Sequence, residues 1–149
     1  MIETAQSEVG TLTRLLVKHA RDAFRGAAAI AGEWHALGFT APPDYATAVR
    51  EYDRFLELLS STGAPVDRLP PSADAGLDSI YVRDASIVCD RGVILCRMGK
   101  PLRQREPAAQ EAWFRAMGYP ILGSIVPPGR LEGGDIVWLD RRTVAAGRG

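Results

Sequence analysis

The 149-residue sequence predicts an α/β fold assembled from repeated strand–strand–helix–strand units. Two stretches with helical periodicity, 45–59 and 107–117, alternate with short apolar runs of β type. Both helical stretches end in Gly, one residue, Pro and then a strand, which gives a repeat of about 55 residues. We therefore expect a modular α/β array, although two crossover connections within one ordinary sheet would produce the same repeated pattern.

Composition narrows the class of protein. The chain is 46% hydrophobic, which suffices for the core of one ordinary domain. Its 18 Lys and Arg residues balance 18 Asp and Glu residues, so neither nucleic acid nor an anionic membrane is an expected partner. We find no charged leader with an apolar core and no apolar run of about 18 residues. A cytoplasmic protein is expected.

The cysteines and histidines do not form a metal-binding pattern. Cys89 and Cys96 flank the predicted turn 90–92, and His19 and His35 lie far away in sequence. A disulfide across the turn is one alternative, but we interpret the cysteines as buried structural thiols in a reducing compartment. We interpret both histidines as solvent-facing loop residues. The sequence thus predicts no metal and no cofactor.

The first half of the chain contains one clear helix. Residues 11–18 form a β-like apolar run, and the Gly/Ala-rich stretch 25–43 is either a loop or a short weak helix. We favour a loop, which could serve as a lid over a pocket. From Asp44, apolar residues recur at steps of four and three, which predicts a helix with one buried face. A short strand is expected at 64–69.

The next predicted unit is a hairpin of strands 79–89 and 93–97. Alternation along the first strand places Asp84 on one face with aliphatic residues, and Tyr81 and Arg83 on the other. The same face as Asp84 carries Asp78, Ile80, Val82, Ser86 and Val88. A lone aspartate in this position usually forms an internal ion pair or caps a neighbouring backbone.

A second helix and a further hairpin complete the pattern. Pro107 opens the helix, and the strand 120–126 follows it. Two β-like runs, 135–139 and 143–146, form another hairpin at the end of the sequence. The predicted buried stripe of the helix comprises Ala109, Trp113 and Met117.

The segment LEGGDIVWLD places charge beside a buried strand. Glu132 precedes Gly133 and Gly134, and we take it to begin a strand, as a second carboxylate on an apolar face. Parallel packing of the repeated units would bring Asp84 and Glu132 together. Two carboxylates in a water-poor pocket need a cation, and a planar guanidinium suits them. That guanidinium is either a protein arginine or a substrate, and the glycines would allow close approach.

Several segments together resemble the guanidino-group-modifying superfamily, above all the dimethylarginine dimethylaminohydrolases. They are DSIYVRDASIV, RMGKPLRQREP and PPGRLEGGDIVWLDRRTVAAGRG, preceded by LLVKHARDAF and PPDYATAVREYDRFLELL. The resemblance covers nearly the whole chain. It implies a five-bladed α/β propeller of strand–strand–helix–strand blades, of which residues 1–149 would form roughly the first half of one domain.

The resemblance also implies a reaction. In the family, a cysteine thiolate attacks the guanidinium carbon, a histidine transfers protons, and the adduct is hydrolysed to citrulline and an amine. Carried over by motif, Asp84 would hold the guanidinium nitrogens, and catalytic Glu132 would do the same and orient the histidine. Asp78 would line the amino-acid end, Arg103 would meet the substrate carboxylate, and Tyr81 would supply an aromatic contact.

One departure leaves the substrate open. Arg83 precedes Asp84 where dimethylargininases typically have Glu, and an Arg-Asp pair is similar to arginine deiminases. The ligand is therefore expected to be arginine or a methylated arginine, with agmatine or an amidino donor as alternatives. Without the resemblance, Arg103 would be interpreted as an exposed arginine and Tyr81 as a sheet-packing residue.

The family's histidine and nucleophilic cysteine belong to later blades, so we expect the 149-residue chain alone to be inactive. One alternative is a truncated remnant, or a half-propeller that binds guanidinium ligands without catalysis. A third is an ordinary α/β domain with a structural Asp–Arg network. An open apolar edge makes a homodimer another expectation.

Overall fold

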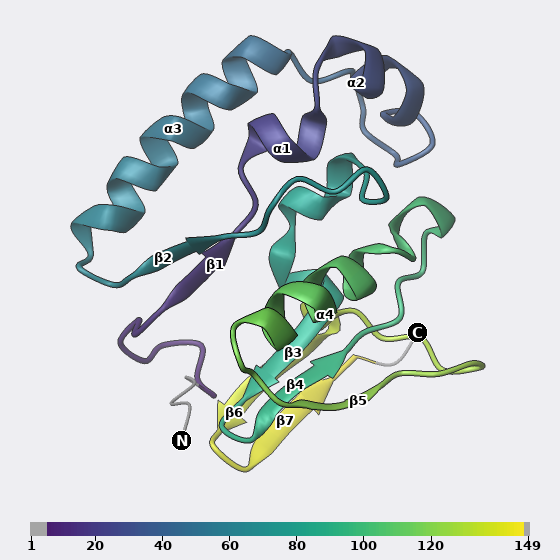
Figure 1. Ribbon diagram of the computed structural model, residues 1–149. Coiled ribbons are helices and arrows are strands. Elements are labelled where there is room, and N and C mark those ends of the chain that lie inside the picture. Colours follow the sequence, from purple (N-terminus) through teal and green to yellow (C-terminus); the bar gives the residue numbers. More distant parts are fainter. Residues whose placement is uncertain (1–5, 148–149) are drawn as a thin grey trace. The chain divides into compact units, whose positions relative to one another are not determined.

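The computed structural model describes residues 6–147, and the chain separates into two compact units (Figure 1). The helical unit is Arg14–Val82. The hairpin unit combines residues 6–13 with residues 83–147. Each unit has a hydrophobic cluster of its own. The α/β class predicted from the sequence is confirmed.

The helical unit is built around a parallel strand pair. Strand β1 (Leu15–Val17) pairs with β2 (Val66–Arg68), and helix α3 (Tyr45–Ser61) connects them. Figure 1 shows α3 running along this pair and the short helix α1 (Ala20–Phe24). The Asp44 carboxylate caps α3 by accepting a hydrogen bond from Thr47 N at 2.8 Å. The predicted helix and the strand at 64–69 are confirmed.

Interpreting residues 25–43 as a loop was wrong. Helix α2 (Ala27–Glu33) occupies the first part of this stretch and buries Ile30. Alanine has the highest helix propensity, and burial of one aliphatic face stabilises even a short helix. The cluster that α2 joins consists of Ala20, Ala23, Phe24, Ile30, Leu37 and Leu77.

The two histidines have different environments. His35 is exposed, as expected. His19 is buried, which contradicts the solvent-facing interpretation. Its Nδ1 accepts a hydrogen bond from Arg21 N at 2.9 Å, and its Nε2 lies 2.9 Å from Asp53 Oδ1. Because both ring nitrogens have partners, His19 can cap α1 from a buried position.

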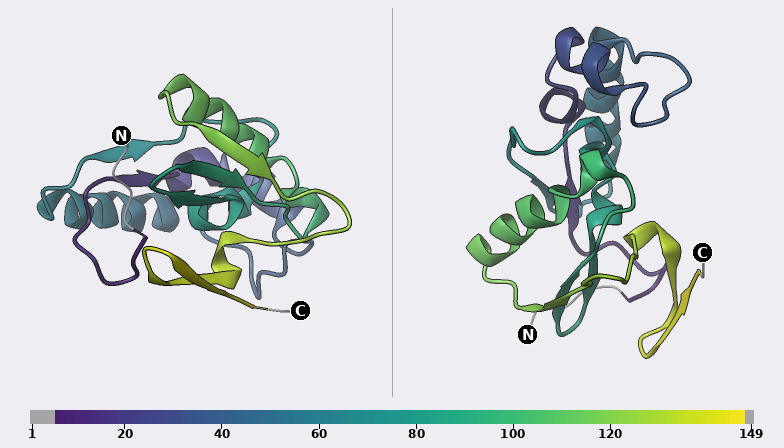
Figure 2. Two further views of the ribbon diagram at one scale, coloured as in Figure 1. Left: turned by 90° about the horizontal axis from the view of Figure 1, so that it is seen from below. Right: turned by 90° about the vertical axis from the view of Figure 1, so that its right-hand side faces the viewer.

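The hairpin unit contains the predicted strand–strand–helix–strand motif. Strand β3 (Ser86–Cys89) is antiparallel to β4 (Gly92–Leu95), and β4 is parallel to β5 (Ile121–Ser124). Helix α4 (Glu106–Ala116) makes the crossover from β4 to β5. The left view of Figure 2 shows the sheet between α4 on one side and the C-terminal hairpin on the other. The described residues contain this motif once in complete form, because the helical unit has one strand, helices and a second strand instead.

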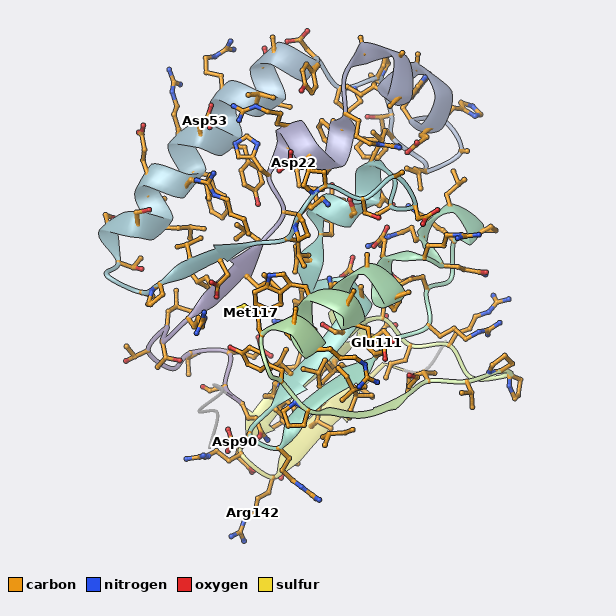
Figure 3. The ribbon with its side chains drawn as sticks, in the orientation of Figure 1. Asp22, Asp53, Asp90, Glu111, Met117 and Arg142 are labelled. Atoms are coloured by element: carbon orange, nitrogen blue, oxygen red, sulfur yellow. The ribbon has the colours of Figure 1, made fainter. Side chains whose placement is uncertain are left out.

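The C-terminal hairpin consists of β6 (Ile136–Asp140) and β7 (Thr143–Ala146). Figure 3 labels Asp90 at the β3–β4 turn and Arg142 at the β6–β7 turn. Arg141 Nε donates to the Asp90 carboxylate at 3.1 Å, which ties the two turns together. Between the hairpins lies a cluster of Ala85, Ile87, Cys96, Met98 and Ile136. Within residues 6–147, the strands form three separate small sheets and no closed ring.

The prediction of one long strand over residues 79–89 was wrong for the first half of that range. Residues Leu77–Ile80 and Val82–Ala85 form two 3-10 turns, η1 and η2, and extended pairing begins at Ser86. Tyr81 N donates to Asp78 O at 2.9 Å, so backbone groups here are satisfied locally instead of by a neighbouring strand. The two-residue alternation therefore does not apply to Asp78, Tyr81 or Asp84.

The buried face of α4 also differs from the predicted stripe. The buried residues are Glu106, Pro107, Gln110 and Phe114, whereas Met117 is exposed. Gln110 faces the sheet because Ser86 Oγ donates to its side-chain oxygen at 2.6 Å. Polar residues with partners can occupy a core face, so apolar spacing alone identified the wrong stripe.

Candidate functional site

Two carboxylates of the hairpin unit converge on one arginine nitrogen. Nη1 of Arg103 lies 3.0 Å from Oδ2 of Asp84 and 3.3 Å from Oε2 of Glu132. The Arg103 side chain is only 5% exposed, whereas those of Asp84 and Glu132 are 22% and 27% exposed. A buried guanidinium therefore holds two carboxylates that both remain accessible to solvent.

The two consecutive glycines allow this convergence. A Cβ atom on Gly133 would lie 1.9 Å from the carbonyl oxygen of Arg83, and one on Gly134 would lie 3.0 Å from Oδ1 of Asp84. Only residues without a Cβ allow the segment after Glu132 to pack this closely against η2. The glycines thus place the Asp84 and Glu132 carboxylates side by side.

Glu132 is held through its side chain and through its backbone N–H. The prediction that Glu132 begins a strand was wrong. Glu132 precedes the 3-10 turn η4 (Gly133–Asp135), and β6 starts at Ile136. Its Oε1 accepts a hydrogen bond from Gly99 N at 2.8 Å, and its own N–H donates to the Asp135 carboxylate at 2.9 Å. These contacts fix the carboxylate with little freedom to rotate.

Arg103 ends the 3-10 turn η3 (Pro101–Arg103), and α4 begins three residues later at Glu106. Its Nε and Nη2 donate to the two carboxylate oxygens of Glu106 at 3.0 and 2.9 Å, and the Glu106 side chain is 3% exposed. Burial alone would lower the pKa of Arg103, but the hydrogen bonds and charge of Glu106, and then those of Asp84, raise it. Arg103 is therefore not an exposed arginine, and it stays charged.

Sequence reasoning missed Glu106. The signal was the spacing Arg-x-x-Glu directly before Pro107, which brings the two side chains to one side of a helical turn. The sequence predicts a helix that begins at Pro107, whereas α4 begins one residue earlier at Glu106. A buried glutamate needs a cationic partner, and the sequence does not show that Arg103 is buried beside it.

The cysteines lack the features of a nucleophile. Both are free thiols, with Cys96 buried and Cys89 half-buried. Burial, followed by the negative charges of Glu132 and Asp84, raises the pKa of Cys96 to about 12. Its thiolate is therefore strongly disfavoured at neutral pH, and Cys96 behaves as a core residue.

Two further predicted site residues belong to the helical unit. Asp78 is buried in η1, and Tyr81, which follows η1, is 53% exposed. Neither lies in the sheet position predicted for it.

Arg83 belongs to the hairpin unit, where Nη1 and Nη2 pair with the Glu8 carboxylate at 3.1 and 3.0 Å. Arg83 also donates to the carbonyl oxygen of Ile136 at 3.0 Å.

Comparison with known proteins gives this cluster a family context. The family model for arginine deiminase matches residues 77–149, which contain Asp84, Arg103 and Glu132. Dimethylarginine dimethylaminohydrolases from Streptomyces coelicolor and Pseudomonas aeruginosa are 29% and 28% identical over 106 and 95 residues. These matches confirm the resemblance to the guanidino-group-modifying superfamily that the sequence motifs indicated. These alignments cover 71% and 64% of the chain, but only 40% and 37% of the two relatives.

Solved structures of two similar proteins share the fold. The P. aeruginosa dimethylarginine dimethylaminohydrolase, a Cys-to-Ser mutant with citrulline, matches with a TM-score of 0.63 at 22% identity. The N-terminal domain of the cyanobacterial arginine dihydrolase ArgZ matches with a TM-score of 0.69, also at 22% identity. The matches cover 84% and 90% of this chain, and 46% and 48% of those chains.

Within residues 6–147, no helix is both long enough and apolar enough to cross a membrane. The same residues contain no group of three or more His, Cys, Asp and Glu side chains arranged to hold a metal ion.

Proposed function

We propose that this chain carries the carboxylate side of the substrate site in a hydrolase of guanidino compounds. Asp84 and Glu132 bind the guanidinium of arginine or a methylated arginine, and the reaction releases citrulline and an amine. The resemblance to this superfamily supports the class of reaction, as do relatives named dimethylarginine dimethylaminohydrolase.

The observation that carries this proposal is the convergence of Asp84 and Glu132 on a single nitrogen of Arg103. Arg103 approaches from the buried side, so the ligand takes the accessible edges of both carboxylates. A ligand guanidinium is planar and presents parallel N–H donors, which suits two neighbouring carboxylates. Fixed carboxylates also orient the reacting carbon, which lowers the entropic cost of attack.

The remaining parts of the reaction come from family resemblance. We propose that a cysteine thiolate and a histidine from later blades of an α/β propeller complete the site, because Cys96 is unsuited to attack. The resemblance assigns Asp78 and Tyr81 to the amino-acid part of the substrate. The contacts of Arg103 favour an orienting role over direct contact with the substrate carboxylate.

A second candidate is arginine deimination. The matching family model is that of arginine deiminase, and Arg83 stands beside Asp84 where dimethylargininases typically have Glu. Arginine would then bind more tightly than its methylated forms. A guanidinium-binding half-propeller without catalysis would bind either ligand and release no citrulline.

Calorimetric titration of the purified protein with arginine and monomethylarginine tests the proposal. We expect binding that Glu132→Gln weakens by about ten-fold or more, since one ionic partner of the cation is lost. Glu111→Gln is the matched control, because Glu111 is an accessible glutamate of α4 that pairs with Arg115 at 2.7 Å. Equal affinities in wild type and Glu132→Gln would contradict the proposal.

A further inference from the structure

We propose that Glu106 is a positioning residue that sets the charge and geometry of this site. The inference rests on the proposed function and concerns how Arg103 can lie beside a cation-binding pair without neutralising it. Glu106 is 3% exposed and engages Nε and Nη2 of Arg103. Only Nη1 then points to Asp84 and Glu132.

Charge gives the reason for this arrangement. An uncompensated Arg103 would neutralise the carboxylates that a guanidinium ligand needs and would repel the ligand directly. Paired with Glu106, Arg103 has little net charge, yet it still donates hydrogen bonds that orient both carboxylates. Asp84 and Glu132 therefore keep their attraction for a cation while their side chains are held in place.

The hydrogen-bond geometry of the Glu106–Arg103 pair supports the same positioning role. Two parallel hydrogen bonds between Glu106 and Arg103 define the plane of the guanidinium. Because both residues lie at the junction of η3 and α4, their separation is set by helical geometry. Without Glu106, the second terminal nitrogen of Arg103 would lose its carboxylate partner and turn towards Asp84 and Glu132, where it would compete with the ligand.

The test compares a charged ligand with a neutral ligand of similar shape. Arginine carries a guanidinium, whereas citrulline carries an uncharged ureido group at the same place. We expect Glu106→Gln to weaken arginine binding by about ten-fold and citrulline binding by less than about two-fold. A merely structural role for Glu106 would weaken both ligands equally, and that result, or no change in either, would overturn the inference.

Glu111→Gln is the control on the same helix, and Figure 3 labels this residue on α4. Because Glu106→Gln removes the buried carboxylate that faces a buried charge, it could fail to fold. The double variant Arg103→Gln/Glu106→Gln removes both charges and avoids that problem. Its arginine-to-citrulline preference should stay within about two-fold of wild type, because the pair it removes has little net charge. A ten-fold loss of that preference would overturn the inference.

Failure of the proposed function would be recognised separately. A wild-type protein that binds neither ligand contradicts the proposed function, and the positioning claim is then decided by NMR of the Arg103 Nε–H group. We expect this hydrogen to exchange slowly in wild type and Glu111→Gln, and rapidly in Glu106→Gln. Slow exchange in Glu106→Gln, or rapid exchange in wild type, would overturn the claim that Glu106 holds Arg103.

Discussion

Oδ1 of Asp84 lies 3.0 Å from the position that a Cβ atom would take on Gly134. This distance is shorter than an ordinary van der Waals contact, so a methyl group at residue 134 would displace the carboxylate. Gly134→Ala should therefore weaken arginine binding by about ten-fold while costing at most about 1 kcal/mol of stability. Calorimetry and urea unfolding measure the two effects. Unchanged affinity would show that arginine binding does not depend on this position of the Asp84 carboxylate.

Gly133→Ala should behave differently. A Cβ atom there would lie 1.9 Å from the Arg83 carbonyl oxygen, and backbone cannot move aside as a side chain can. We expect this variant to lose roughly 2–4 kcal/mol of unfolding free energy, measured by urea denaturation. A loss smaller than that of Gly134→Ala would contradict the proposed packing of η4 against η2.

Cys96 should be inert towards thiol reagents in the folded protein. Burial and nearby carboxylates raise its pKa to about 12, so very little thiolate exists at pH 8. Alkylation with iodoacetamide, followed by mass spectrometry, should label Cys89 first and Cys96 only after unfolding. Preferential labelling of Cys96 would be inconsistent with its buried position.

The Glu8–Arg83 pair should give the hairpin unit a pH-dependent contribution. The hydrogen bond with Arg83, followed by that from Trp138 N, lowers the pKa of Glu8 from 4.5. A lowered carboxyl pKa adds stability above 4.5, and this stability is lost as the pH falls through the pKa of the folded state. Because the pair is partly exposed, wild type should exceed Glu8→Gln by only about 0.5 kcal/mol at pH 7. Urea unfolding at pH 7 and pH 3 should show that this difference disappears in acid, and a difference that persists there would refute the assignment.

Elements with a strong sequence period were predicted well. Helix α3 was recognisable because its apolar residues recur at helical spacing after Asp44, whose carboxylate caps it. The hairpins and β5 were recognisable from short β-type runs between turn residues. Sequence period carries this information because it records which face of an element is buried.

The elements around the site were less predictable. Residues 77–85 form 3-10 turns, whose local hydrogen bonds leave no two-residue period to detect. The convergence of Asp84 and Glu132 was inferred correctly, but from a strand alternation that does not exist. A protein arginine was one of two guanidinium sources considered for that pair, but Arg103 was assigned to the substrate carboxylate instead. Its burial against Glu106 depends on tertiary contacts that no local pattern records.

The central claim is that Asp84 belongs to a binding site rather than to a structural ion-pair network. Asp84→Asn distinguishes the two when arginine affinity and unfolding free energy are measured on the same preparation. Our account predicts an arginine affinity reduced by about ten-fold or more, with a stability loss of a few kcal/mol or less. A folded Asp84→Asn protein that binds arginine as tightly as wild type would contradict it, and would leave Asp84 and Glu132 as structural partners of Arg103.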